Sequence, residues 1–275
     1  MTKYFCFFIF LLIFCFKAES QHATIRSRSE LGFLLGGTYY IGDLNRFNQV
    51  ENTKLAGGLI YRFNVNPRLS LRGNFIYGNV TGDDSQSNME LYKNRNLNFT
   101  SSIFEGAAGI EFNYFPFEIG HNRYKGTAYL LAEIGVFRMN PMTRFDGENI
   151  ELQPLGTEGQ GSSLSKRGTY SLTQLCVPIG FGAKLSLGKW AAINFELGLR
   201  KTFTDYIDDV HSNTYVDHEI LATENGTLSA ALSNRSLDRS LHGKRGTASS
   251  KDWYVFSGLM VTFKLGKRKG CAFTY

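Results

Sequence analysis

WAAINFELGLRKTF, residues 190–203, alternates between two kinds of side chain along its whole length. One set is apolar and comprises Ala191, Ile193, Phe195, Leu197, Leu199 and Phe203. The other set is polar or small and comprises Asn194, Glu196, Gly198, Arg200 and Thr202. A period of two places the sets on opposite faces of a β-strand, whereas the period of a helix would mix them. This segment therefore predicts a long strand with one apolar and one polar face.

The same alternation recurs in seven other stretches. Residues 253–265 place Trp253, Val255, Leu259, Val261, Phe263 and Leu265 opposite Tyr254, Gly258, Met260, Thr262 and Lys264. The remaining stretches are residues 31–41, 55–63, 69–77, 104–114, 127–139 and 170–185. Together they predict an all-β protein of about eight strands.

The connections between these stretches alternate in length. Short turns at residues 64–68, 115–126 and 187–189 follow the second, fourth and sixth strands, and the other connections are longer and polar. Short turns at one end and long loops at the other are typical of bacterial outer-membrane barrels. We therefore expect a transmembrane, antiparallel, up-and-down β-barrel. Its extracellular loops are expected near residues 43–54, 80–100, 140–168 and 207–251, with both chain ends in the periplasm.

The polar face of the strands separates this interpretation from a soluble sandwich or lipocalin-like barrel, which also has strands of period two. That face combines many glycines with a balanced set of charges, Arg62, Arg72, Lys184, Arg200 and Lys264 with Glu105, Glu111, Glu133 and Glu196. An eight-stranded barrel has an interior just wide enough to be filled by side chains. We therefore expect these residues to pair as a charge network that closes the lumen, so that the barrel is not a diffusion pore.

The first twenty residues have the pattern of a cleaved signal peptide. Lys3 precedes an apolar run over residues 4–16, and the small residues Ala18 and Ser20 place cleavage before Gln21. The alternative is a retained anchor, which normally needs about 20 apolar residues. Residues 21–275 are then expected to form one barrel domain with a basic periplasmic tail at 266–275, including Lys267, Arg268, Lys269 and Cys271.

Charge and cysteine content indicate neither a nucleic-acid partner nor a disulfide-rich fold. The formal net charge is +6, or +5 without Lys3, Lys17 and Glu19, and the basic residues are scattered, so no nucleic-acid partner is expected. Cys6 and Cys15 lie in the signal peptide, and the remaining Cys176 and Cys271 make no disulfide framework. A single bridge between these two cysteines in an oxidising periplasm is the alternative to two free thiols.

Candidate catalytic and metal-binding patterns are weak. The five histidines, His22, His121, His211, His218 and His242, lack the spacing of metal ligands. Residues 159–163, GQGSS, lack the order of a nucleophile elbow. Asp205, Asp208 and Asp209 offer carboxylates for Ca²⁺, but without calcium-loop spacing a solvated rim is the favoured interpretation. No cofactor, metal or catalytic residue is therefore expected.

Four stretches carry a family resemblance: ELGFLLGGTYYIGDL at residues 30–44, FRMNP at 137–141, PLGTEGQG at 154–161 and RKTFTDYIDDV at 200–210. In this combination and order they resemble the PorG-like outer-membrane proteins of Bacteroidota. The resemblance implies an outer-membrane location in a Gram-negative bacterium, contact with membrane lipid, and a non-enzymatic part in type IX protein secretion and gliding motility. It also implies association with the periplasmic ring formed by PorK and PorN, for which the basic tail is a candidate docking segment.

Two other functions remain open from the residues. Some small outer-membrane barrels are lipid-modifying enzymes, for which His211 near Asp209 is the candidate pair. A structural or adhesive barrel without any attached machinery is the second alternative.

Overall fold

The computed structural model describes residues 28–45, 50, 52–238 and 243–266. The expected signal peptide and the tail residues Lys267, Arg268, Lys269 and Cys271 lie outside the described residues. Predictions about these two segments therefore stay predictions.

Eight strands close into an antiparallel barrel, as the alternating pattern predicted. They are β1 (Ser29–Ile41), β2 (Lys54–Asn64), β3 (Leu69–Asp83), β4 (Asn98–Asn113), β5 (Gly126–Phe145), β7 (Thr173–Ser186), β8 (Ala191–Thr202) and β9 (Trp253–Leu265). Each strand pairs with its sequence neighbour among these eight, β1 pairs with β9, and the β4–β5 pairing makes the ring continuous. A closed ring leaves no unpaired sheet edge, which is the condition for strands to cross a bilayer.

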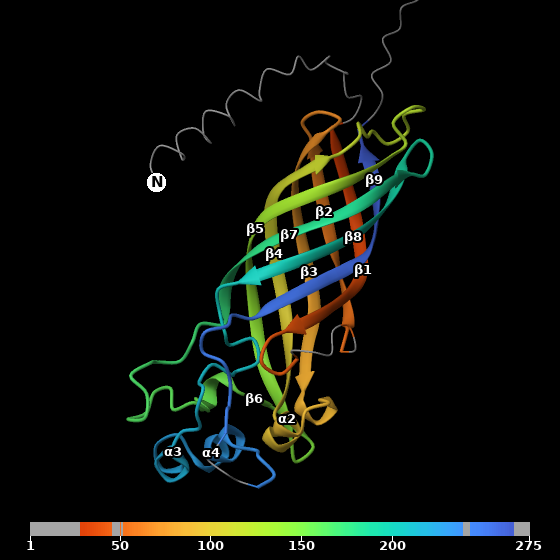
Figure 1. Cartoon of the computed structure of the whole chain (residues 1–275). Helices are drawn as coiled ribbons and strands as arrows, with labels where there is room; N and C mark the ends of the chain where they lie inside the picture. Colours follow the sequence, from red (N-terminus) through yellow and green to blue (C-terminus); the bar gives the residue numbers. More distant parts are fainter. Residues whose placement is uncertain (1–27, 46–49, 51, 239–242, 267–275) are drawn as a thin grey trace, which may run out of the picture.

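The barrel has two unlike ends, visible at the top and bottom of Figure 1. The turn end carries the short turns 65–68, 114–125 and 187–190, together with the start of β1 and the end of β9. The loop end carries the long connections and their short elements. These are η1 (Asp84–Gln86), α2 (Glu90–Arg95), β6 (Glu148–Glu151), η2 (Gln153–Leu155), α3 (His218–Glu224) and α4 (Thr227–Ser233). Within the described residues no helix is both long enough and apolar enough to cross a membrane.

Three strands extend further toward the loop end than predicted. β3 ends at Asp83 and β4 begins at Asn98, because these two ends pair with each other. β5 ends at Phe145, because residues 140–142 pair with β4 and residues 142–145 pair with β6 despite their polarity. Asp146 and Gly147 have φ values of 50° and 87°, the conformation of a two-residue hairpin turn. The Asp-Gly pair was thus the missed sequence signal for the β5–β6 hairpin.

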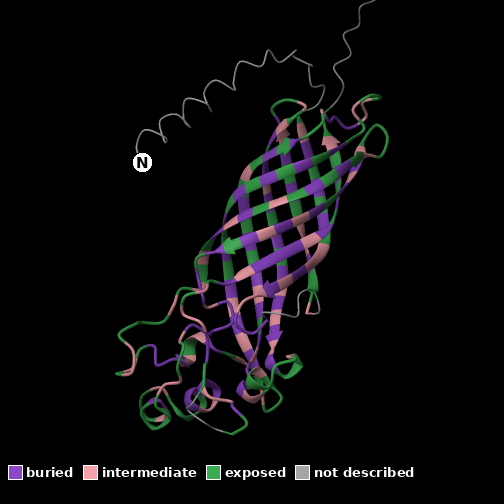
Figure 2. Ribbon diagram, in the orientation of Figure 1, coloured by how far each residue is buried: buried purple, intermediate pink, exposed green. Residues whose placement is uncertain are grey.

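The two faces of the strands have opposite environments, shown as alternating bands in Figure 2. On β5, Leu130 and Ile134 are 63% and 73% exposed, whereas the intervening Leu131 and Glu133 are buried. Similar exposed apolar residues on the outer face include Phe33, Leu35, Phe104, Leu175, Phe181, Phe195 and Leu259. An apolar exterior around a charged interior is the arrangement of a transmembrane barrel and the inverse of a soluble one.

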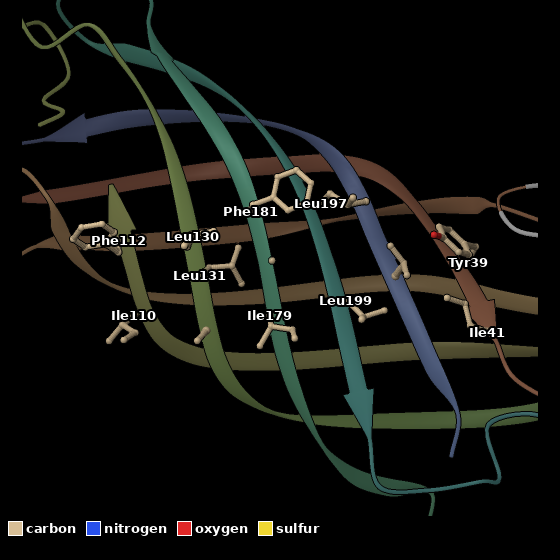
Figure 3. A pocket seen from close by; sticks show the side chains of 13 residues that line it. Tyr39, Ile41, Ile110, Phe112, Leu130, Leu131, Ile179, Phe181, Leu197 and Leu199 are labelled. Carbon is tan, nitrogen blue, oxygen red and sulfur yellow. The ribbon is translucent and has the colours of Figure 1, made fainter. Parts of the chain in front are cut away.

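A shallow groove of about 790 Å³ crosses this outer face (Figure 3). One of its walls follows a single register row across six strands: Tyr39, Val255, Leu199, Ile179, Ala132 and Ile110. The lining is almost entirely apolar and lies on the membrane-spanning strands. The groove is therefore part of the lipid-facing surface.

Candidate functional site

The centre of the lumen is occupied by a salt bridge that spans the barrel. Arg72 on β3 reaches Glu196 on β8, with Nη1 2.7 Å from Oε2 and Nη2 3.3 Å from Oε1. These strands lie on opposite sides of the ring. Tyr129 donates a hydrogen bond of 2.8 Å to the same Glu196 carboxylate. A bidentate guanidinium–carboxylate pair of this kind is both strong and geometrically specific.

Glu111 joins three cations toward the turn end. Its Oε2 accepts hydrogen bonds from Arg62 Nε at 2.8 Å and from Arg72 Nη1 at 3.1 Å. Its Oε1 contacts the ammonium of Lys184. Arg62 also lies 3.8 Å from the carboxylate of Glu30. Each charge therefore has a partner of opposite sign in a region that water cannot fill freely, which offsets the cost of its burial.

Two further carboxylates are buried in the lumen. Glu105 accepts hydrogen bonds from Arg200 Nε at 3.2 Å and from the Tyr254 hydroxyl at 2.7 Å. Glu133 lies 3.0 Å from Arg72 Nε and accepts a hydrogen bond from Asn74 at 2.7 Å. The lumen thus holds two sets of ion pairs and hydrogen bonds, one centred on Arg72 and the other on the Arg200–Glu105 pair.

The structure places all of the predicted lumen residues except Lys264 in one of these two sets. Lys264 lies near the end of β9, where its ammonium is 3.2 Å from the Ile119 carbonyl and 3.5 Å from Glu118. Sequence analysis also missed Glu30, which precedes the predicted start of the first strand by one residue. Its position in the alternation, two residues before Gly32, was the available signal.

The turn between β4 and β5 covers the turn end of the lumen. Phe117 and Ile119 are 4% and 1% exposed and pack against Ala192 of β8. Gly120 has a φ of +80° and donates a hydrogen bond to Ser186, and a Cβ at this glycine would lie 2.8 Å from the Lys189 carbonyl. Its backbone conformation and close approach both require glycine. The turn is therefore a fitted cover for the mouth of the barrel.

The loop end is closed by a cap in which the family-resembling stretches meet. From the first stretch, the Tyr40 hydroxyl lies 2.6 Å from Asp208 Oδ2 and 2.7 Å from Asp252 Oδ1. Burial raises the pKa of Asp208 and of Asp252 well above the ordinary carboxyl value, and the charges of neighbouring carboxylates raise both pKa values further. One hydroxyl has a single proton, so the second short contact places a proton on one of the two carboxyls.

The third and fourth resembling stretches also contact each other in the cap. Thr157 and Tyr170 both donate hydrogen bonds to the carboxylate of Asp209. Glu158 accepts from the backbone N–H of His211 at 2.9 Å and forms an ion pair with Arg245. The motifs that carry the resemblance therefore build one packed structure at the loop end.

A second buried ion pair ties the β1–β2 and β3–β4 connections into the cap. Arg95 donates to both carboxylate oxygens of Asp84, each at 2.7 Å, and its Nη2 donates to the Asp43 carbonyl at 2.9 Å. Thr247 donates its backbone N–H to the Asp43 carboxylate at 2.7 Å. Residues that are distant in sequence are thereby held together by charged hydrogen bonds.

Two expectations about the cap were wrong. Asp205, Asp208 and Asp209 were expected to form a solvated rim, but each is 2% exposed, because the long loops fold over them. His211 was expected near Asp209, but its Nδ1 lies 2.7 Å from Asp205. Burial raises the pKa of Asp205 and of Asp209 to about 6.

Among the described residues no group of three or more His, Cys, Asp or Glu side chains is arranged to hold a metal ion.

Three other sequence candidates, Cys176, His121 and His218, lie in the part of the chain that the structure describes. Cys176 is a free thiol buried in the barrel, and Cys271 lies outside the described residues. His121 accepts backbone hydrogen bonds within the β4–β5 turn, and His218 begins α3.

Comparison with known proteins places the chain in a family. A model of the family described as "Domain of unknown function (DUF6089)" matches residues 3–274. The chain belongs to the DUF6089 family. A search of curated proteins finds no match for this DUF6089 chain.

Several solved structures are similar to this DUF6089 barrel at low identity. Neisserial surface protein A is 8% identical, with a TM-score of 0.42, and the match covers 86% of this chain and 97% of that one. The attachment invasion locus protein Ail of Yersinia pestis is 9% identical, with a TM-score of 0.42 and coverage of 88% and 100%. The outer membrane protein OprG from Pseudomonas aeruginosa is 7% identical, with a TM-score of 0.40 and coverage of 88% and 99%.

Proposed function

We propose that this chain is a non-enzymatic outer-membrane component of the type IX secretion machinery and that it anchors the periplasmic ring of PorK and PorN. The resemblance of four sequence stretches to PorG-like proteins supports the assignment to this secretion machinery. The closed lumen supports a role as an anchor and not as a channel. The turn end is proposed to face the periplasm and the cap to face the exterior, as in bacterial barrels with short periplasmic turns.

The observation that carries the proposal is the Arg72–Glu196 bridge across the lumen, with the β4–β5 turn beneath it. A solute crossing the barrel would have to separate this buried pair, which costs several kcal/mol. The barrel is thus poorly suited to conduct substrates itself. Its contribution to secretion is then made by contacts at its ends.

The charge of the turn end favours an acidic partner. Arg68, Arg123, Lys125 and Lys189 are exposed on the three turns. Within these described turns the one carboxylate is Glu118, which is 7% exposed and lies beside Lys264. The tail, which follows β9 in the sequence, is also basic. A surface of one sign steers and selects a partner of the opposite sign.

Charge reversal tests this docking surface. We expect Arg123→Glu with Lys125→Glu to reduce co-purification of PorK-like and PorN-like proteins from detergent-solubilised outer membranes at least severalfold, with normal membrane insertion. The matched control is Lys54→Glu with Lys166→Glu, since both lysines are exposed at the loop end. Equal loss in both variants would show that net charge alone matters. A wild-type protein that brings down no ring component would remove the secretion assignment.

Deletion of residues 266–275 tests the tail separately. β9 ends at Leu265, so the deletion leaves every barrel strand intact. We expect insertion to be unchanged, co-purification and secretion to fall, and moderate salt to weaken the contact, because exposed charges are screened. If the truncated chain co-purifies and secretes like the full-length chain, the docking surface is made by the turns alone.

A lipid-modifying enzyme is the second candidate, favoured by one observation. His211 and Asp205 form a buried pair of the type that serves in acid–base catalysis. Lipid A of unchanged mass after deletion of the gene would remove this candidate. An adhesive barrel would instead lose surface attachment on deletion while secretion continued.

A further inference from the structure

A polar cavity lies in the cap between the 146–172 and 203–252 connections. Its volume is about 450 Å³, and its lining includes Gln160, Arg167, Tyr206 and His211. This volume is within the range of roughly 300–1,000 Å³ that small-molecule sites occupy. The cavity belongs to the loop end and is separate from both the lumen network and the turn end.

The walls of the cavity are held in place by buried hydrogen bonds. Glu158 accepts from the backbone N–H groups of His211 and Ser212, at 2.9 and 2.8 Å. The Tyr206 ring stacks on Tyr170, with centroids 4.3 Å apart and planes inclined by 7°. Asn225 donates its side-chain amide to three carbonyls of residues 155–160, which fixes the adjoining loop. The cavity is therefore preformed, which reduces the entropy lost on binding.

Gln160, which lines the cavity, has a buried amide donor for which no described residue is the acceptor. Gln160 is 4% exposed, and its Oε1 accepts a hydrogen bond of 2.9 Å from the Glu158 backbone N–H. Its Nε2 has no hydrogen-bond partner among the described residues. A buried amide donor without a partner destabilises the folded protein. A ligand oxygen that reached this donor would satisfy it.

The lining also indicates the chemistry of the ligand. Hydroxyl groups of Ser165 and Thr214 can donate or accept hydrogen bonds, and Tyr206 adds an aromatic surface. The Glu158 carboxylate is paired with Arg245, whereas Arg167 is an exposed cation at the edge. Donors, acceptors and an aromatic surface suit a ring with several hydroxyls, and Arg167 suits a carboxylate on it.

We propose that this cavity binds a saccharide unit that carries a carboxylate. Gln160 donates to a ring oxygen or hydroxyl, and Arg167 pairs with the carboxylate. The site is independent of the proposed docking at the turn end, so either proposal can fail without the other.

Saturation-transfer NMR on the full-length protein in nanodiscs tests the site with three probes. D-glucuronate has both features, D-glucose has only the hydroxylated ring, and acetate has only the carboxylate. We expect glucuronate to bind about tenfold more tightly than glucose, the factor expected for one charge-assisted contact. Acetate is expected to show no saturable binding.

Two variants assign the contacts. Arg167→Gln should lower the affinity for glucuronate to that for glucose and leave glucose binding unchanged. The control is Lys166→Gln, since Lys166 is the exposed neighbour with the same charge and does not line the cavity. Gln160→Glu keeps the acceptor oxygen but removes the amide donor, and should weaken both sugars.

Three results would overturn the proposal. Acetate binding as tightly as glucuronate would mean that the site recognises a bare anion. The absence of saturable binding by both sugars would mean that the cavity is not a saccharide site. An equal loss of glucuronate binding in Arg167→Gln and Lys166→Gln would mean that the attraction is only the general charge of the loop.

Discussion

Arg72 and Glu196 meet in the middle of the barrel although they belong to strands on opposite sides of the ring. Inward glycines make room for the long side chains that reach this point. A Cβ at Gly182 would lie 2.4 Å from Tyr129 Cζ, and Tyr129 donates to Glu196. The glycines on the polar face therefore leave the space that the long buried side chains occupy.

Removal of Glu196 should destabilise the barrel. We expect Glu196→Ala to lower the free energy of unfolding by about 3–5 kcal/mol, because Arg72 loses its bidentate partner and keeps its buried charge. Denaturant unfolding in detergent micelles measures this. Glu148→Ala, which removes an exposed carboxylate, should change stability by less than about 0.5 kcal/mol. Similar losses in both variants would contradict a central role for the pair.

The wild-type barrel should show no stable open conductance in planar bilayers. The lumen is filled by the network around Arg72 and Glu111, and the turn end is covered by Phe117 and Ile119. Single-channel recording at moderate voltage checks this expectation. Long-lived open steps would show that the cover and the network move aside together.

The cap should become less stable as pH rises from about 4 to about 6. Burial raises the pKa of Asp209 from 3.8 to about 6, so the folded cap holds this proton more tightly than the open chain. Stability is therefore greatest below the unfolded pKa, and it falls by up to about 3 kcal/mol as pH passes the folded pKa.

Limited proteolysis of the cap measures this dependence, because cleavage tracks the open population when opening is fast. Asp209→Asn removes the titration, and asparagine suits the φ of 63° at this position. The variant should therefore flatten the pH profile over the same range. Faster cleavage of the wild type at about pH 4 than at about pH 6, corrected for protease activity, would reverse the predicted sign.

Cysteine labelling should distinguish the two ends of the barrel on intact cells. Lys166→Cys in the 146–172 connection should react with an impermeant reagent, and Lys189→Cys in a short turn should not. Both lysines are exposed, so a difference in labelling between the two positions reports the side of the membrane on which each lies and not a difference in burial. Ser163 is also suitable, whereas Ser233 is buried in the cap and is not. A Cys271→Ser background removes the tail thiol. Labelling at position 189 alone would invert the topology.

The sequence alone determined the barrel and most of the charged residues in its lumen. Alternation around Phe195, Glu196 and Arg200 assigns each residue to a face, because successive side chains in a strand point to opposite sides. The alternation of short and long connections then indicates an up-and-down order, in which consecutive strands are neighbours. This information is local, since strand faces and turns depend on neighbouring residues.

Only the tertiary structure decided which charges pair and how the ends close. Lys264 has the alternation of a lumen residue, yet its neighbour is Glu118 in a turn that folds back under the barrel. Asp208 and Asp252 are far apart in sequence and come together on Tyr40 because several loops converge there. Such contacts depend on the path of irregular segments over the barrel mouth. No periodic pattern encodes that path, so the cap and its polar cavity emerge only when the whole chain is folded.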